Sequence, residues 1–161
     1  MVHIELSSRG RDTIALEMPD ISYFSTNRSG GLEENCWEAE NKLLTYRISD
    51  FRCRDFNVTR YQIYCKEDCC MRSLNVGNSF MGLSVVRQGI VECFLSETRD
   101  KRIWRKGYTN VIVSSGIKEE RNLFRKGDTF GMTSILVSSD FFFYLSERYS
   151  DYLLSAYLRL G

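Results

Sequence analysis

Short stretches that favour β-strands follow one another along almost the whole of this 161-residue chain. They are rich in β-branched or aromatic residues and are separated by Gly, Asn, Asp or Ser. The stretches are residues 3–18, 42–49, 60–65, 69–74, 80–86, 90–96, 102–107, 109–115 and 130–138. Their alternation and spacing predict a mainly antiparallel β fold, a sandwich or a barrel, in one domain. Residues 25–40, which are acidic and interrupted by glycine, are expected to form a loop with a short helical turn.

Charge is nearly balanced, with 22 basic and 21 acidic residues and a formal net charge of +1. A segment that grips nucleic acid or an anionic membrane needs a strongly basic surface, and this balance does not provide one. No apolar run reaches the roughly 20 residues of a membrane-spanning helix, and the first residues lack the apolar core of a signal peptide. We therefore expect a cytoplasmic protein with no membrane partner and with its six cysteines reduced.

Residues that commonly carry catalysis or bind metals are sparse. The single histidine, His3, stands near the N-terminus, where a frayed or edge strand is expected. The cluster Cys65, Cys69 and Cys70 matches no common zinc spacing, so packing within strands is favoured over a redox-sensing pair. No pair of carboxylates is set apart for acid–base work. These residues predict no catalytic site, no metal and no cofactor, and hence no enzymatic activity.

Residues 79–97 contain two apolar stretches on either side of the segment 87–89, which predicts a hairpin. The two-residue period of a strand divides each arm into two faces. One face of the first arm holds Met81, Leu83 and Val85, and one face of the second holds Val91, Cys93 and Leu95. A polar turn should follow and lead into a second hairpin arm, with Gly107 and Gly116 at points where the backbone needs positive φ.

The last twenty or so residues change to a helical period. Ser139 or Asp140 is expected to cap one helix, and Ser150 or Asp151 a second. Four apolar residues lie near one face of the second helix, namely Tyr152, Leu153, Tyr157 and Leu160. An exposed apolar stripe of this kind needs a partner surface, so it predicts the interface of a homodimer.

Three segments carry a resemblance to a known family: FMGLSVVRQGIVECF, WRKGYTNVIVSSG and RNLFRKGDTFGMTSILVSSDFFFYL. Their order resembles the N-terminal sensory domain of AraC-type transcription regulators, best over residues 43–160. In that family a strand ends in a Gly turn, a Gly-led strand leads to a second turn, and a third strand runs into a helix through a Ser-rich cap. These roles would fall on Gly89, on residues 107–116 and on residues 135–141. The resemblance implies a cupin-like jelly-roll barrel that senses a small molecule and dimerises through the helices after it.

Two departures limit this resemblance. Cupin enzymes hold a metal with histidines on adjacent strands, but the segment YTNVIVSSG after Gly107 has none, and Ser115 stands where a proline is common. The regulators also continue into a DNA-binding domain with helix-turn-helix units, and this chain ends at Gly161. We therefore expect the sensory half of a longer regulator, which would contact DNA only through that further domain. A stand-alone relative is the alternative.

The expected function is therefore effector sensing, with a barrel over residues 1–140 and a helical dimerisation segment over 141–161. The effector would be a small molecule, uncharged or aromatic rather than charged. Candidate pocket residues, each of which could instead be packed core, are Tyr61, Tyr64, Met81, Leu83, Val85, Phe94, Trp104 and Ile112. The alternatives are a cupin-like enzyme, such as an isomerase or a thiol-dependent oxygenase, and an oligomerisation module with a filled barrel.

Overall fold

The computed structural model describes residues 3–8, 11–16, 32–76, 80–96, 101–114 and 117–149. Within these ranges the chain forms a series of strands and one helix. The strands are β1 (His3–Ser8), β2 (Arg11–Leu16), β3 (Glu33–Glu40), β4 (Leu44–Arg52), β5 (Phe56–Cys65), β6 (Cys69–Val76), β7 (Phe80–Gln88), β8 (Ile90–Leu95), β9 (Lys101–Arg105), β10 (Thr109–Ser114), β11 (Ile117–Phe124) and β12 (Thr129–Ser138), and the helix is α1 (Ser139–Arg148). The expected mainly β class is confirmed.

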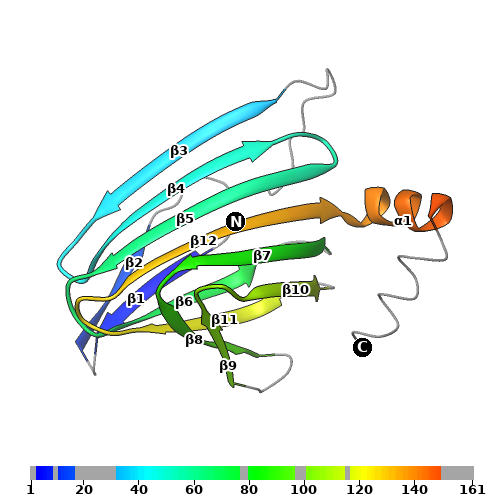
Figure 1. The fold of residues 1–161 in the computed structure, drawn as a ribbon. Coiled ribbons are helices and arrows are strands. Elements are labelled where there is room, and N and C mark those ends of the chain that lie inside the picture. Colours follow the sequence, from blue (N-terminus) through cyan, green and yellow to red (C-terminus); the bar gives the residue numbers. More distant parts are fainter. Residues whose placement is uncertain are drawn as a thin grey trace.

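The strands form two six-stranded antiparallel sheets that lie face to face (Figure 1). The front sheet has the order β10-β7-β12-β5-β4-β3, and the rear sheet has the order β2-β1-β6-β11-β8-β9. From β5 onward the chain passes repeatedly from one sheet to the other. Strand pairing joins no strand of the front sheet to one of the rear sheet among the described residues. The described residues therefore form two facing antiparallel sheets, and closure into the cupin-like jelly-roll barrel expected from the sequence stays a prediction.

Residues 79–97 do not form a hairpin, which corrects the sequence-based prediction. β7 pairs with β10 and β12 in the front sheet, whereas β8 pairs with β9 and β11 in the rear sheet. The chain crosses between the sheets at Gly89, whose φ is 78°. A crossing and a hairpin look alike in sequence, because each joins two strands through a short glycine turn. The hairpin lies one strand later, between β8 and β9. Gly107 has the expected positive φ of 85°, and Gly116 lies outside the described residues.

The acidic stretch expected to be a loop contains a full strand, β3. Among the described residues it lies at the edge of the front sheet and pairs only with β4, and every second residue is half-buried. An edge strand tolerates charged residues on its outer face, so its sequence lacks the apolar signal of a central strand. β11 was also missed, because its inward residues include the polar Glu120 and Asn122.

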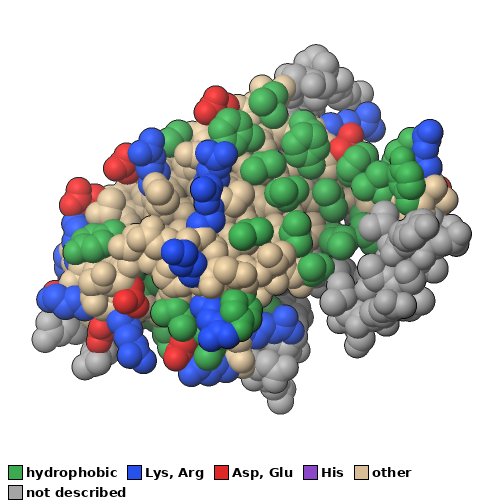
Figure 2. Space-filling model, in the orientation of Figure 1, with side chains coloured by type: hydrophobic (Ala, Val, Ile, Leu, Met, Phe, Trp, Pro, Cys, Tyr) green, Lys and Arg blue, Asp and Glu red, His purple; other side chains and the backbone are tan. Residues whose placement is uncertain are grey.

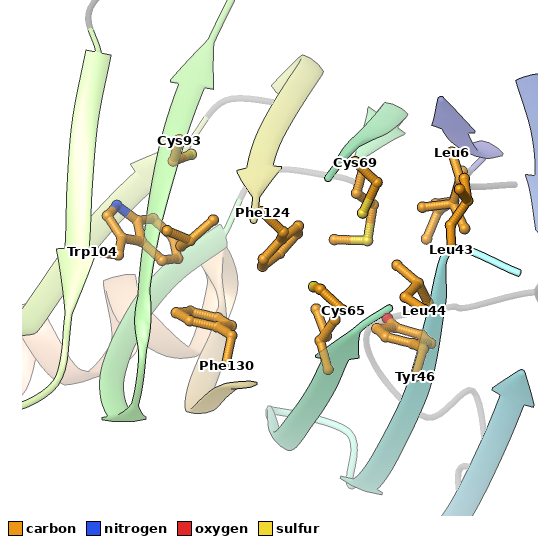
Figure 3. Close-up of a cluster of buried hydrophobic side chains, with 14 of the residues drawn as sticks. Leu6, Leu43, Leu44, Tyr46, Cys65, Cys69, Cys93, Trp104, Phe124 and Phe130 are labelled. Atoms are coloured by element: carbon orange, nitrogen blue, oxygen red, sulfur yellow. The ribbon is translucent and has the colours of Figure 1, made fainter. Parts of the chain in front are cut away.

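Apolar side chains fill the end of the intersheet space where β4 begins and β5 ends (Figure 3). Leu44 and Cys65 are wholly buried there, and Phe124 of the rear sheet meets Phe130 of the front sheet edge to face, with ring centroids 5.9 Å apart. Fully burying a large apolar side chain contributes about 1.5–3 kcal/mol to stability. This cluster therefore holds the two sheets together at one end. Different residues lie between the sheets at the opposite end.

Helix α1 follows β12 directly, as the change of period predicts. Its cap is Ser138, one residue before the expected Ser139 or Asp140, and Ser138 Oγ accepts a hydrogen bond from Phe141 N at 3.2 Å. Residues 150–161, with the expected second helix and the apolar stripe, lie outside the described residues. Among those that are described, no helix has the length and apolar character needed to cross a membrane.

Candidate functional site

A row of polar residues crosses the inner face of the front sheet in register. Each of its six strands contributes one residue, and strand pairing places each residue directly opposite the next. From edge to edge this polar row is Asn35, Asp50, Thr59, Ser134, Ser84 and Asn110. Directly opposite residues project to the same face of a sheet, so all six side chains share one face. Buried polar groups are the informative exceptions in an interior, and this row contains several.

Asp50 is the single acid of the row, with 1% of its surface exposed, and it is held on several sides. Its carboxylate pairs with the Arg52 guanidinium and accepts a hydrogen bond from Asn57 Nδ2 at 2.5 Å. Thr59 Oγ1 lies 3.0 Å from Asp50 Oδ1 and 2.5 Å from Asn57 Oδ1. The Arg52 guanidinium also lies over the Trp37 ring, 5.4 Å from its centroid. A buried charge is stable only when it is paired in this way, and the Asp50–Arg52 pair carries no net charge.

The other half of the row is made of small neutral groups. Ser84 Oγ and Ser134 Oγ lie 2.8 Å apart, and both residues are nearly fully buried. Asn110 stands opposite Ser84, and its buried Nδ2 has no hydrogen-bond partner among the described residues. A buried donor without a partner costs about 1–3 kcal/mol. An acceptor atom on a bound molecule would remove that cost.

Polar residues of the rear sheet face the row. Glu120 Oε1 accepts hydrogen bonds from Asn122 Nδ2 at 2.8 Å and from the Cys93 thiol at 3.7 Å. Burial raises the pKa of the Glu120 carboxyl, while those two hydrogen bonds act in the opposite direction. Burial, then the Glu120 carboxylate, also raises the pKa of the Cys93 thiol. Glu120 is thus a buried carboxyl that accepts hydrogen bonds from two neutral donors, Asn122 and Cys93.

Tyr61 connects the two groups of residues. Burial raises the pKa of its phenol well above the ordinary value, and the nearby Glu120 and Asp50 carboxylates add to the effect. Glu120 belongs to the rear sheet and Asp50 to the front sheet, so the phenol of Tyr61 interacts electrostatically with both sheets. The arrangement offers hydroxyl, amide and carboxyl groups to a molecule between the sheets.

The candidate pocket residues from the sequence divide between the two faces of the sheets. Tyr61 and Trp104 belong to the inner faces. Tyr64, Met81, Leu83 and Val85 lie on the outer face of the front sheet, and Phe94 lies on the outer face of the rear sheet. Ile112 pairs with Gly82, and its side chain is not among those described. The interior is therefore lined by only part of the expected set, and an effector pocket remains a prediction.

The wrong face of β7 was chosen because Met81, Leu83 and Val85 are its larger apolar residues. The inner face instead holds Gly82, Ser84 and Val86, and the serine belongs to the polar row. A usable signal was present in the neighbouring strands, where Asp50 and Ser134 each interrupt an otherwise apolar alternation. A single polar residue in one strand does not by itself indicate a site. Only strand pairing shows that the interruptions in successive strands lie side by side.

The cysteine cluster divides as adjacent strand residues must, with Cys69 buried between the sheets and Cys70 on the other face. Cys65 and Cys69 lie against each other in the core (Figure 3). Their mutual hydrogen bond raises the pKa of Cys65 and lowers that of Cys69. In the part of the chain that the structure describes, no three His, Cys, Asp or Glu side chains gather as metal ligands would. The donors of the polar row do not fit a metal held by histidines, so no metal-dependent step is assigned to them.

No family model matches the sequence. No curated protein matches it either. Solved structures with a similar fold include a Cupin 2 conserved barrel domain protein from Salinispora arenicola, 9% identical, at a TM-score of 0.44 over 84% of this chain and 99% of that one. Another is the Cupin_2 domain of an XRE family transcriptional regulator from Enterobacter cloacae. It is 12% identical, with a TM-score of 0.39 over 50% of this chain and 81% of that one. A third is a cupin-superfamily sugar phosphate isomerase from Silicibacter pomeroyi. It is 8% identical, with a TM-score of 0.38 over 57% of this chain and 60% of that one.

These similarities correct one expectation. The missing histidines led us to expect no enzymatic activity, but the similar structures include a sugar phosphate isomerase and DMSP lyases as well as regulator domains. Enzymatic activity is therefore unresolved for this chain, and the missing histidines do not exclude it. The regulators among these structures carry the XRE and HTH_3 family names rather than AraC. All of these TM-scores lie below 0.5, so they assign neither an activity nor a ligand.

Proposed function

We propose that this chain binds a small polar molecule between its two sheets, at the polar row, and acts as an effector-sensing domain. The observation that carries the proposal is Asn110, whose buried amide nitrogen has no partner among the described residues and stands beside the Ser84–Ser134 hydroxyl pair. The resemblance of residues 43–160 to AraC-type sensory domains supports the regulatory part of the proposal.

The chemistry of the row favours a neutral ligand that carries hydroxyl groups. The charge of Asp50 is already balanced by Arg52, so it does not call for a cationic ligand. Ser84, Ser134 and Asn110 can donate to and accept from hydroxyl oxygens. On the rear sheet, the raised pKa of Glu120 favours its neutral form, in which it too can donate a hydrogen bond. A sugar or a polyol matches these groups.

Occupancy can reach the helix through β12. Ser134 lies in the polar row, and Ser138, at the end of the same strand, caps α1. A ligand that binds two strand arrangements with different affinity shifts the balance between them, and α1 moves with the end of β12. In a regulator, an attached DNA-binding domain would respond to that shift.

The test is a thermal-unfolding screen against neutral monosaccharides and polyols, followed by calorimetric titration of any compound that stabilises the protein. A ligand at a hundred times its Kd adds about 2.7 kcal/mol, which raises Tm by about 5–11 °C for a domain of this size. The variant Asn110→Leu should abolish the rise. The control Thr109→Ala, at an exposed residue next to Asn110, should keep it. An equal rise in Asn110→Leu would contradict binding at the polar row.

Glu120 favours a second candidate function, acid–base catalysis on the bound molecule. Burial raises the pKa of the Glu120 carboxyl, which is the direction that suits a proton donor, and the carboxyl faces the same interior as Tyr61. Proton NMR of the ligand during incubation with the protein separates the two functions. An unchanged ligand supports sensing. Conversion that stops in Glu120→Gln, with binding retained, supports catalysis.

Dimerisation is a separate proposal, supported by the apolar stripe of Tyr152, Leu153, Tyr157 and Leu160. An isologous helix–helix contact would bury the stripe in both copies. Light scattering should give the mass of a dimer, and Leu153→Asp should reduce it to that of a monomer. A monomer in the parent protein at high concentration would overturn the proposal.

A further inference from the structure

Three arginines gather in a depression on the outer face of the front sheet, on the side away from the polar row. Arg47 of β4, Arg60 of β5 and Arg87 of β7 line a hollow of about 440 Å³. The other residues with polar side chains that line it are Ser49, Tyr61, Gln62, Gln88 and Thr133, and no carboxylate lines it. Figure 2 looks onto this face and shows Lys and Arg side chains standing on it beside a hydrophobic area. The depression is therefore a basic site in a protein whose net charge is only +1.

Some of the charged residues on the described surface are neutralised by a partner of opposite charge. Arg72 and Arg121 share Glu119, and Lys66, Lys101 and Lys126 each pair with a glutamate. None of the three arginines of the depression forms an ion pair with a carboxylate in the described part of the chain. Arginines on a surface normally find acidic neighbours or point singly into water. Glu38 stands opposite Arg47 in the pairing of β3 with β4, but no carboxylate lines the hollow itself, so its guanidinium groups leave a positive charge that an anion can neutralise.

Local structure holds two of these arginines in place. Arg60 stacks over the Phe51 ring, 6.0 Å from its centroid, which orients the guanidinium while leaving its donors available. The pairing of β7 with β12 shifts register between Gly131 and Met132. This shift leaves Arg87 as the extra residue of a β-bulge between Val86 and Gln88, both of which are paired. A bulge re-aims side chains, and here it leaves Arg87 and Gln88 both exposed, where a regular strand would turn one inward.

A second, independent observation comes from the floor of the hollow. Thr133 lies opposite Arg60 in the pairing of β5 with β12, and its buried Oγ1 has no hydrogen-bond partner among the described residues. Beside it, Gly131 has no side chain to obstruct the approach to the backbone. The hollow thus combines positive charge with a neutral hydroxyl at its floor that has no hydrogen-bond partner among the described residues.

The geometry points to a binding site for a small molecule that carries a phosphoryl group or a similar multiply charged oxyanion. The strands of Arg47 and Arg87 are three strand spacings apart, about 14 Å, so the long side chains can converge on an anion over β5 and β12. A carboxylate is satisfied by one guanidinium, whereas a phosphoryl group has three terminal oxygens and up to two charges. The volume falls within the range of ligand pockets, about 300–1,000 Å³.

The test is calorimetric titration of the whole chain with inorganic pyrophosphate at constant ionic strength, with succinate as the carboxylate comparison. We expect one saturable pyrophosphate site and at least about tenfold weaker binding in Arg47→Gln and in Arg87→Gln, because each removes a charge-assisted contact. Thr133→Val should weaken binding without changing the charge. The matched control Arg102→Gln removes an exposed arginine of β9 in the rear sheet and should leave binding unchanged.

Three results would overturn the proposal. They are no saturable binding of pyrophosphate, succinate binding as tightly as pyrophosphate, and an equal loss in Arg102→Gln and Arg47→Gln. A Glu-rich peptide that binds in place of pyrophosphate would also overturn it and would make the hollow a contact for an acidic protein segment. All the exchanged arginines are exposed, so circular dichroism should show the parent fold in every variant.

Discussion

Ser84 and Ser134 face each other directly across β7 and β12, with their hydroxyl oxygens 2.8 Å apart inside the protein. Each stands in a strand whose other inward residues are mostly apolar or small. The pair therefore costs hydrophobic contact in the middle of the front sheet and gains one buried hydrogen bond. Because the pair lies in the polar row next to Asn110, we interpret this loss of hydrophobic contact as serving the binding of a ligand.

The serine pair should show a strong coupling in stability. Ser134→Ala leaves the Ser84 hydroxyl buried with its partner removed, which should lower the free energy of unfolding by about 1–3 kcal/mol. Removing both hydroxyls leaves no orphan, so the double variant Ser84→Ala/Ser134→Ala should lose less than the sum of the single variants. Urea unfolding of all four proteins measures this. Strict additivity would show that the two hydroxyls do not depend on each other.

Sequence reasoning reached the class of this fold but not its topology. Alternation in 80–86 and 90–96 correctly gave two strands, yet β7 and β8 belong to different sheets, because a crossing through Gly89 leaves the same local pattern as a hairpin. The edge strand β3 escaped notice because its outer face is charged. The polar row escaped because it exists only across strands: Asp50 and Ser134 are 84 positions apart in the chain and come together through Thr59. Strand pairing over such long separations cannot be predicted from the pattern of any short stretch of sequence.

Asp50 should be essential for stability. Asp50→Ala removes the carboxylate from the buried Arg52 guanidinium and should cost about 3–5 kcal/mol of unfolding free energy. The matched surface control is Glu92→Ala, which breaks the partly exposed pair with Lys101 and should cost about 0–1 kcal/mol. Replacing both charges, as in Asp50→Leu/Arg52→Met, should recover much of the loss. Chemical denaturation gives all of these values, and an equal cost for the two single alanine variants would contradict the role given to Asp50.

Gly89 should be the least replaceable of the turn glycines. Its φ is +78°, and a Cβ built there would lie 2.1 Å from the carbonyl oxygen of Thr129, a backbone atom that cannot move aside alone. Gly127 has a similar φ of +82° but no atom within 4 Å of the same position. Gly127→Ala should therefore cost only the backbone term, about 1–2 kcal/mol, whereas Gly89→Ala should cost distinctly more. Thermal unfolding of both variants checks this, and similar Tm values would show that β12 can shift away from the turn.

Neighbouring glutamates of β11 should give pH dependences of opposite sign. The pKa of Glu120 is raised by burial, so the folded state binds its proton more tightly than the unfolded state does. The stability from this proton is present below the ordinary pKa of 4.5 and is lost as pH rises through the folded pKa. Glu120→Gln removes that loss. The variant should match the parent near pH 4 and become more stable than the parent as pH approaches 7.

Glu119 supplies the control on the other face of the same strand. Hydrogen bonds from Arg72 and Arg121 lower the pKa of its carboxyl from 4.5 to about 2. Its stabilising effect is therefore present above the unfolded pKa and disappears as pH falls toward 2. Glu119→Gln should be less stable than the parent at pH 7, with the difference shrinking on acidification. Urea unfolding between pH 3 and 7 compares the two variants. A difference from the parent that grows with pH in the same direction for both would show that Glu120 is not held in a buried, proton-binding environment.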